Sequence, residues 1–310
     1  MTRIEEQRYI RIGGIDQWIQ IRGENRENPV LFILHGGPGS PYALFTPLLR
    51  EWEQHFTVVH WDRRGAGKTL RRNGKKGCGE MTFDRCVEDA IELAEHLRTC
   101  LDKDKLVLMA GSMGTLVGLP LVQRRPDLFS TYVCTDQFVN MVRNEEESYR
   151  LAGDHKALAK IGPDPRKWNL RAWGVKMRFT MDNAVLAKLF LPLVKGREVY
   201  GLRDIPALLR GFSYSKTALF DEFMAYDARK FGTRFEVPFV LIQGAQDRVT
   251  VTSLAQEHFA EMDAPSKAMV LIEGAGHFCA FTHPSEFLAV LREKVERPRS
   301  EGEGAGAVPA

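Results

Sequence analysis

The stretch Ala110–Gly114, with the sequence AGSMG, constrains the fold of this chain more than any other segment. The apolar run 105–109 before it is typical of a buried strand, and the apolar segment 115–122 after it favours a buried helix. A serine between small residues on a sharp strand-to-helix turn exposes its hydroxyl above the sheet, where a base can reach it. The sequence therefore predicts that Ser112 is a nucleophile, and that other segments supply a base, an acid and an oxyanion hole.

The length and composition are those of an ordinary globular protein. The 310 residues are 44% hydrophobic and 27% charged, with a formal net charge of +3. Such a chain can form one large domain with an insertion or two small domains, and its nearly neutral charge predicts no nucleic-acid partner. No signal peptide and no apolar run of about 18 residues is recognisable, so we expect no membrane span. Five irregularly spaced cysteines predict free thiols and a cytoplasmic protein.

Apolar runs alternate with segments of helical periodicity along most of the chain. The predicted strands are 8–12, 17–21, 29–34, 56–61, 105–109, 131–134, 237–243 and 268–273. The predicted helices are 41–54, 82–101, 115–122, 252–262 and 284–295. We expect the first two strands to form an antiparallel hairpin around Gly13 and Gly14. The predicted fold class is α/β, with a mostly parallel, eight-stranded sheet flanked by helices.

The pattern changes between residues 136 and 235. Helical patches occur there at 145–151, 168–179, 183–194 and 205–212, without a good buried strand. We interpret this stretch as a helical cap inserted before the last two strands. The predicted domains are a first part of the core at 1–135, the cap at 136–235, a second part of the core at 236–297, and a disordered tail at 298–310.

His277 is the predicted base and Asp247 the predicted acid. They lie in the turns EGAGHF and QGAQDRV, which follow the last two predicted strands. The base takes the serine proton during attack, and the acid fixes the imidazole tautomer and stabilises its charged form. The chain order of Ser112, Asp247 and His277 is the one expected for a serine on such a turn. Asp136, which follows the strand 131–134, is the alternative acid.

The segment HGGPG at 35–39 follows a predicted strand and offers N–H groups to an oxyanion. A tetrahedral oxyanion needs preorganised donors, and we assign the N–H of Met113, directly after the nucleophile, and the N–H of Gly37. The absent side chain of Gly37 lets a substrate oxygen approach. His35 is expected to hold this loop rather than to perform catalysis.

Other segments predict no further chemistry. GAGKT at 65–69 ends like a phosphate-binding loop, but that pattern needs a glycine where Asp62 stands. The basic run 71–76 is predicted to be a solvated loop, with weak steering of anionic substrates as its functional alternative. No cluster of His, Cys, Asp or Glu has metal-ligand spacing, so we expect neither a metal nor an organic cofactor.

Three motifs together resemble the proline iminopeptidase branch of the α/β-hydrolases. They are HGGPGSP at 35–41, DRRGAGKT at 62–69 and the turn at Ser112, and the HGGPG spelling is the most specific. The resemblance covers roughly residues 10–135 and 237–295. It implies an α/β-hydrolase fold with a cap over the site, the triad Ser112, Asp247 and His277, and an oxyanion hole of Gly37 and Met113.

Two features depart from that branch. Its members usually carry tryptophan after the nucleophile, whereas Met113 is more usual in esterase-like and carbon–carbon bond hydrolases of this fold. Its members hold the free amine of the substrate with acidic cap residues, for which 145–147 and 221–222 are available here. An apolar funnel containing Phe179 would instead favour an ester or a hydrophobic ketone. The predicted substrate contacts are Gly36, Glu145, Trp168, Trp173 and Phe278.

The leading hypothesis is a serine hydrolase that cleaves an amide or ester of a small molecule or short peptide through an acyl-enzyme. Aminopeptidase action on an N-terminal proline is the named prediction. The alternative within this class is an esterase, lactonase or carbon–carbon bond hydrolase acting on a small metabolite. The alternative of another class is a catalytically inactive, ligand-binding protein on the same scaffold.

Overall fold

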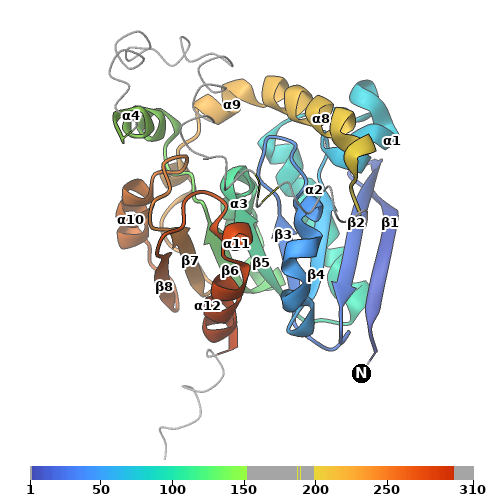
Figure 1. Ribbon diagram of the computed structural model, residues 1–310, viewed down its shortest axis with the longest axis horizontal. Helices are drawn as coiled ribbons and strands as arrows, with labels where there is room; N and C mark the ends of the chain where they lie inside the picture. The colour runs from blue at the N-terminus through green and yellow to red at the C-terminus, as the bar shows by residue number, and fades with distance from the viewer. Residues whose placement is uncertain (1, 152–186, 188, 190–198, 297–310) are drawn as a thin grey trace, which may run out of the picture.

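An eight-stranded sheet forms the centre of the protein (Figure 1). The computed structural model describes residues 2–151, 187, 189 and 199–296. The strand order across the sheet is β1-β2-β4-β3-β5-β6-β7-β8. The strands are β1 (Ile4–Ile12), β2 (Ile15–Gly23), β3 (Val30–Leu34), β4 (Thr57–Asp62), β5 (Leu106–Gly111), β6 (Phe129–Thr135), β7 (Phe239–Gly244) and β8 (Lys267–Ile272). The predicted α/β class and its eight strands are confirmed.

The first two strands form an antiparallel edge to an otherwise parallel sheet. β1 pairs with β2, and β2 pairs antiparallel with β4, whereas β4, β3, β5, β6, β7 and β8 run parallel. Gly13 and Gly14 form the hairpin turn with φ angles of 53° and 77°, which glycine adopts without steric cost. The predicted hairpin is confirmed. Both strands are longer than predicted because their pairing continues from Ile12 and Ile15 back to Ile4 and Gly23.

Helices cover both faces of the sheet (Figure 1). One face packs against α2 (Phe83–Leu101), α3 (Thr115–Arg124) and α10 (Thr252–Glu261). The other face packs against η1 (Tyr42–Gln54), α11 (Cys279–Thr282) and α12 (Pro284–Glu296). Successive side chains of a strand point to opposite faces. Phe239 and Leu241 of β7 therefore join the first cluster, while Val240 and Ile242 join the second.

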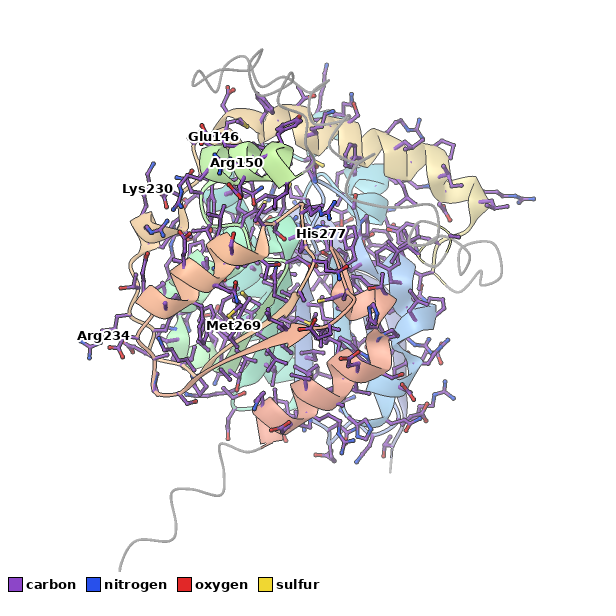
Figure 2. The ribbon with its side chains drawn as sticks, turned by 60° about the vertical axis from the view of Figure 1, so that its left-hand side comes forward. Glu146, Arg150, Lys230, Arg234, Met269 and His277 are labelled. Carbon is purple, nitrogen blue, oxygen red and sulfur yellow. The ribbon has the colours of Figure 1, made fainter. Side chains whose placement is uncertain are left out.

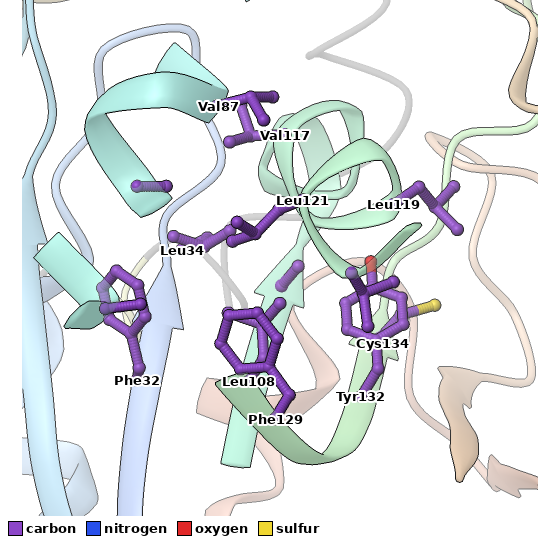
Figure 3. Packing of buried hydrophobic residues seen from close by; sticks show 14 of the residues in the cluster. Phe32, Leu34, Val87, Leu108, Val117, Leu119, Leu121, Phe129, Tyr132 and Cys134 are labelled. Carbon is purple, nitrogen blue, oxygen red and sulfur yellow. The ribbon is translucent and has the colours of Figure 1, made fainter. Parts of the chain in front are cut away.

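The packing of the core holds the turn that carries Ser112 in place above the sheet. Figure 3 shows the buried cluster in which Leu121 of α3 lies beside Leu34 of β3, and Val117 of α3 lies beside Val87 of α2. All four side chains are at most 1% exposed. Burying such a side chain stabilises the fold by about 1.5–3 kcal/mol. This packing holds α3 against the sheet, so the turn that joins β5 to α3 has little freedom to move.

Two predicted local assignments are corrected by the structure. The segment predicted as a helix at 41–54 is a 3₁₀ helix over Tyr42–Gln54 with a break at Leu49, and Pro47 within it lacks the N–H that a regular α-helix needs. The basic run 71–76, predicted as a loop, lies on the helix α1 (Gly67–Gly77). The periodicity of that helix was not recognisable because only its first turn is buried.

The described residues between β6 and β7, within the stretch predicted to be a cap, contain helices. They include α4 (Met141–Leu151), α8 (Ile205–Ala218) and α9 (Phe220–Met224), which lie along one edge of the sheet (Figure 1). Ser215 Oγ of α8 donates to the carbonyl of Gly65, on the loop after β4, at 2.9 Å. This contact places α8 over the carboxyl ends of the parallel strands. The predicted patch 168–179, most of 183–194 and the tail 298–310 lie outside the described residues.

Within the described residues, no helix has both the length and the apolar character that crossing a bilayer requires.

Candidate active site

Ser112 lies on the turn between β5 and α3, where the backbone is tightly constrained. Its φ angle of 52° is in the left-handed region, which is unfavourable for a residue with a Cβ atom. A Cβ atom on Gly114 would lie 2.3 Å from the carbonyl oxygen of Leu34, and one on Gly118 would lie 2.7 Å from Cβ of Ala110. The small residues around Ser112 are therefore required by the close approach of α3 to the strands.

Three predicted residues meet in one hydrogen-bonded chain. The Nε2 atom of His277 lies 3.2 Å from Oγ of Ser112, and Nδ1 of His277 lies 2.9 Å from Oδ2 of Asp247. The chain distances are 165 and 30 residues, so only the fold brings these side chains together. His277 is on the loop after β8 and lies below α4 in Figure 2. Because Asp247 accepts a hydrogen bond from the N–H at Nδ1, the ring proton stays on Nδ1, and Nε2 of the neutral ring can accept the proton of Ser112.

Asp247 is held by a dense set of hydrogen bonds in its own loop. Its Oδ1 accepts from the backbone N–H groups of Val249 at 2.7 Å and Thr250 at 3.0 Å, and its Oδ2 accepts from Oγ1 of Thr250 at 2.6 Å. Burial alone would raise the pKa of Asp247. The charge of His277 and the hydrogen bonds from His277 and Thr250 outweigh burial and lower this pKa below its usual value. The carboxylate is therefore ionised and rigidly aimed at the imidazole.

Asp136, the alternative acid, lies in the same site. Its Oδ1 is 3.9 Å from Nδ1 of His277 and accepts from the N–H of Phe278 at 3.3 Å. Burial raises the pKa of Asp136 to about 7; the charge of His277 opposes this rise and that of Asp247 adds to it. The shorter contact of Asp247 makes it the hydrogen-bond partner of the imidazole. The carboxylate and imidazole atoms of this trio lie within 4.8 Å of one another, close enough to hold a metal ion, but His277 Nδ1 is already hydrogen-bonded to Asp247.

The HGGPG loop packs directly against the nucleophile. A Cβ atom on Gly36 would lie 2.9 Å from Cβ of Ser112. Gly37 has a φ angle of 127°, and a Cβ atom there would lie 2.4 Å from the backbone nitrogen of Gly39. Only glycine fits at either position. The predicted oxyanion residue Gly37 thus lies one residue from a direct contact with Ser112, and the side chain of Met113 is buried in the core.

His35 connects the HGGPG loop to the loop after β4 through hydrogen bonds. Its Nε2 accepts from the backbone N–H of Arg63 at 3.3 Å, which assigns the ring proton to Nδ1, and Nδ1 lies 2.8 Å from the carbonyl oxygen of Gly36. Burial and the charge of Arg63 lower the pKa of His35 well below its usual value, so the ring is neutral. Nη2 of Arg63 donates to the same carbonyl at 3.2 Å. Sequence reasoning missed Arg63; the signal was a charged residue just past a buried strand.

The remaining predicted substrate residues have different surroundings. Phe278 meets the His277 ring edge-on, with ring centroids 4.4 Å apart. Glu145 is buried on α4, next to Asn144, whose Nδ2 donates to the carbonyl of Val249 at 2.7 Å. Trp168, Trp173 and Phe179 lie outside the described residues.

The acidic pair 221–222 is exposed. Oε2 of Glu222 accepts from the N–H of Phe83 at 2.9 Å, at the N-terminus of α2. This carboxylate therefore has a structural partner outside the candidate site.

The fold and the site define a hydrolase of the α/β type, and comparison with known proteins agrees. The model of the alpha/beta hydrolase family matches residues 30–290. The chain is 30% identical over 298 residues to the probable aminopeptidase YbaC of Bacillus subtilis (strain 168), covering 90% of this chain and 93% of the relative. The chain belongs to the alpha/beta hydrolase family.

Two further similar proteins are related to proline iminopeptidases by name. Over 158 residues the chain is 28% identical to the proline iminopeptidase of Clostridioides difficile (strain 630), covering 48% of this chain and 51% of the relative. The crystal structure of a proline iminopeptidase-related protein from Thermus thermophilus superimposes with a TM-score of 0.66 at 23% identity. That match covers 94% of this chain and 98% of the other. The predicted resemblance to proline iminopeptidase-like hydrolases is confirmed.

Proposed function

We propose that this protein is a serine hydrolase whose triad is Ser112, His277 and Asp247, and whose substrates are short peptides with an N-terminal proline. The observation that carries the proposal is the position of the His277 ring, 3.2 Å from the serine oxygen on one side and 2.9 Å from the carboxylate on the other. This is the distance at which a base can take the serine proton during attack.

The reaction proceeds in two halves. Oγ of Ser112 attacks the substrate carbonyl carbon while its proton passes to Nε2 of His277, and the N–H groups of Gly37 and Met113 stabilise the oxyanion. The carbon–nitrogen or carbon–oxygen bond then breaks, and His277 gives its proton to the leaving amine or alcohol. In the second half, water loses a proton to His277 and attacks the acyl carbon. The bond from that carbon to Oγ of Ser112 then breaks, which releases the acid, and His277 returns its proton to Oγ.

The aminopeptidase assignment is supported by two relatives that are named as an aminopeptidase and as a proline iminopeptidase. A buried carboxylate on the cap, that of Glu145, is a candidate partner for a substrate amine. Ester hydrolysis is the second candidate, because Met113 follows the nucleophile where iminopeptidases usually have tryptophan. The five free cysteines support a reducing, cytoplasmic location for either activity.

The test combines covalent labelling with a substrate panel. A fluorophosphonate probe is expected to label wild-type protein at Ser112, and Ser112→Ala is expected to lose both labelling and turnover. Ser130→Ala is the matched control, because Ser130 is exposed near the amino end of β6, away from the site. Proline arylamides cleaved in preference to short and long acyl esters support the aminopeptidase, and the reverse order supports the esterase. Full activity of Ser112→Ala would refute the triad.

A further inference from the structure

The Gly36–Gly37 peptide receives two hydrogen bonds at one end. Its carbonyl oxygen lies 2.8 Å from Nδ1 of His35 and 3.2 Å from Nη2 of Arg63, both of which are donors. The peptide is trans and planar, so its carbonyl and its N–H point in opposite directions. The N–H at the other end belongs to Gly37, the proposed oxyanion donor. His35 and Arg63 therefore both bind the carbonyl end of the peptide whose N–H end would bind the oxyanion.

Arg63 is a buried cation, and its surroundings differ from those of the neighbouring Arg64. Its side chain is only 4% exposed. Within the described part of the chain its guanidinium forms no salt bridge with a carboxylate, and Nη1 has no hydrogen-bond partner. The next residue, Arg64, is equally buried but is paired with Asp89 at 2.9 Å. A buried charge that has no carboxylate partner among the described residues is costly, so the packing around Arg63 does not by itself favour a cation there.

The guanidinium of Arg63 lies close enough to the nucleophile to affect the charge that develops there. Gly36, whose carbonyl Arg63 binds, lies against Cβ of Ser112. Negative charge develops on the substrate oxygen beside Ser112 during attack, in a buried environment where electrostatic interactions are strong. A charged donor bonded to a carbonyl polarises the whole peptide and strengthens the hydrogen bond that its N–H can give. His35, which is neutral, fixes the plane of the same peptide but adds no charge.

We propose that Arg63 is a positioning residue that polarises the Gly36–Gly37 peptide and thereby strengthens the oxyanion hole. This inference rests on the proposed function, because it assigns a role only if Ser112 attacks a carbonyl. The guanidinium keeps its protons throughout and acts through the peptide, without touching the substrate. Its effect is confined to the transition state and the tetrahedral intermediates, since the ground-state carbonyl carries much less charge.

Arg63→Met removes the charge and keeps an unbranched side chain. We expect kcat for a p-nitrophenyl ester to fall about tenfold with KM unchanged, since losing an oxyanion donor altogether costs about 10²–10³-fold. The affinity for a boronic acid that forms a tetrahedral adduct with the serine should fall by the same factor. Arg234→Met is the control, because Arg234 is exposed and lies far from His277 (Figure 2). It should leave kcat and boronate affinity unchanged.

Chemical rescue separates charge from packing. The small variant Arg63→Ala should regain activity on addition of millimolar guanidinium but not of urea, which has nearly the same planar shape and no charge. Arg63→Lys should retain more activity than Arg63→Met, because it keeps the cation. If circular dichroism shows that the neutral variants do not fold, the test rests on Arg63→Lys. Its boronate affinity is expected to be near that of the wild type. A fall in that affinity of about tenfold or more overturns the inference.

Two results would overturn the role of Arg63 without touching the proposed function. One is a wild-type kcat in folded Arg63→Met. The other is a rise in KM with unchanged boronate affinity, which is what a purely structural residue produces. The proposed function fails separately, if the wild-type protein is not labelled by the fluorophosphonate at Ser112.

Discussion

The buried carboxyl of Asp136 predicts a loss of stability as pH rises. Its pKa is raised from 3.8 to about 7, first by burial and then by the nearby charge of Asp247, against the opposing charge of His277. The folded protein therefore binds this proton more tightly than the unfolded chain does. The stabilisation is fully present below about pH 4 and is lost progressively until about pH 7. One pKa unit corresponds to about 1.4 kcal/mol, so the total loss is at most about 4 kcal/mol.

Asp136→Asn isolates this contribution, because the amide has the shape of the protonated carboxyl and does not titrate. The free energy of unfolding in urea would be measured for wild type and variant at pH 5 and at pH 8.5. From pH 5 to pH 8.5, the free energy of unfolding of the variant should rise by about 2–3 kcal/mol relative to that of the wild type. Asp104→Asn, a change of the same chemistry at an exposed position, should show no such shift.

A difference between Asp136→Asn and wild type that stays constant with pH would refute the reasoning. It would mean that Asp136 is ionised in the folded protein throughout this range. The pair of carboxylates beside His277 would then be compensated by some other group, and Asp136 would compete with Asp247 as the acid.

Three other substitutions test the site and its supports. Asp247→Asn should lower kcat by about 10³–10⁴-fold with the protein still folded, because an amide favours the wrong tautomer of His277; activity within tenfold of wild type would argue against this acid. Gly37→Ala should lower kcat by about 10²-fold or more, whereas Gly74→Ala, also at positive φ but with no atom near its Cβ position, should leave turnover intact. Tyr200→Phe removes a hydrogen bond to a buried carboxylate and should reduce the free energy of unfolding by about 1–3 kcal/mol, as measured by urea denaturation.

The central strands were predictable from sequence because they are continuous apolar runs. β3, β5 and β7 are buried along their whole length, and a run of this kind has few alternatives in a chain of alternating helices and strands. The helix α1 was not predictable, since its second half, RRNGKKG, carries no apolar stripe and its buried residues are confined to the first turn. The 3₁₀ character of η1 likewise depends on packing around Pro47.

The candidate site was predictable in its composition but not in its geometry. Asp136 and Asp247 both follow parallel strands, and β6 and β7 are neighbours in the sheet, so the ends of both strands reach the same place. The sequence therefore favoured Asp247 while leaving Asp136 as an alternative, and the distances to His277, 2.9 Å from Asp247 and 3.9 Å from Asp136, agree with that preference. Arg63 was missed because its role depends on the contact between the loops after β3 and β4.

Two described helices of the proposed cap, α4 and α8, contact opposite sides of the candidate site, so the position of the proposed cap is coupled to the geometry of the triad. On α4, Asn144 donates to the carbonyl of Val249 and accepts from the N–H of Val251 at 2.9 Å, and so clamps the loop that carries Asp247. On α8, Ser215 binds the loop after β4, next to the oxyanion loop. A substrate that shifts the cap would therefore shift the acid as well. Asn144→Ala should accordingly lower kcat and not only raise KM in steady-state kinetics, and a change confined to KM would show that the cap only binds.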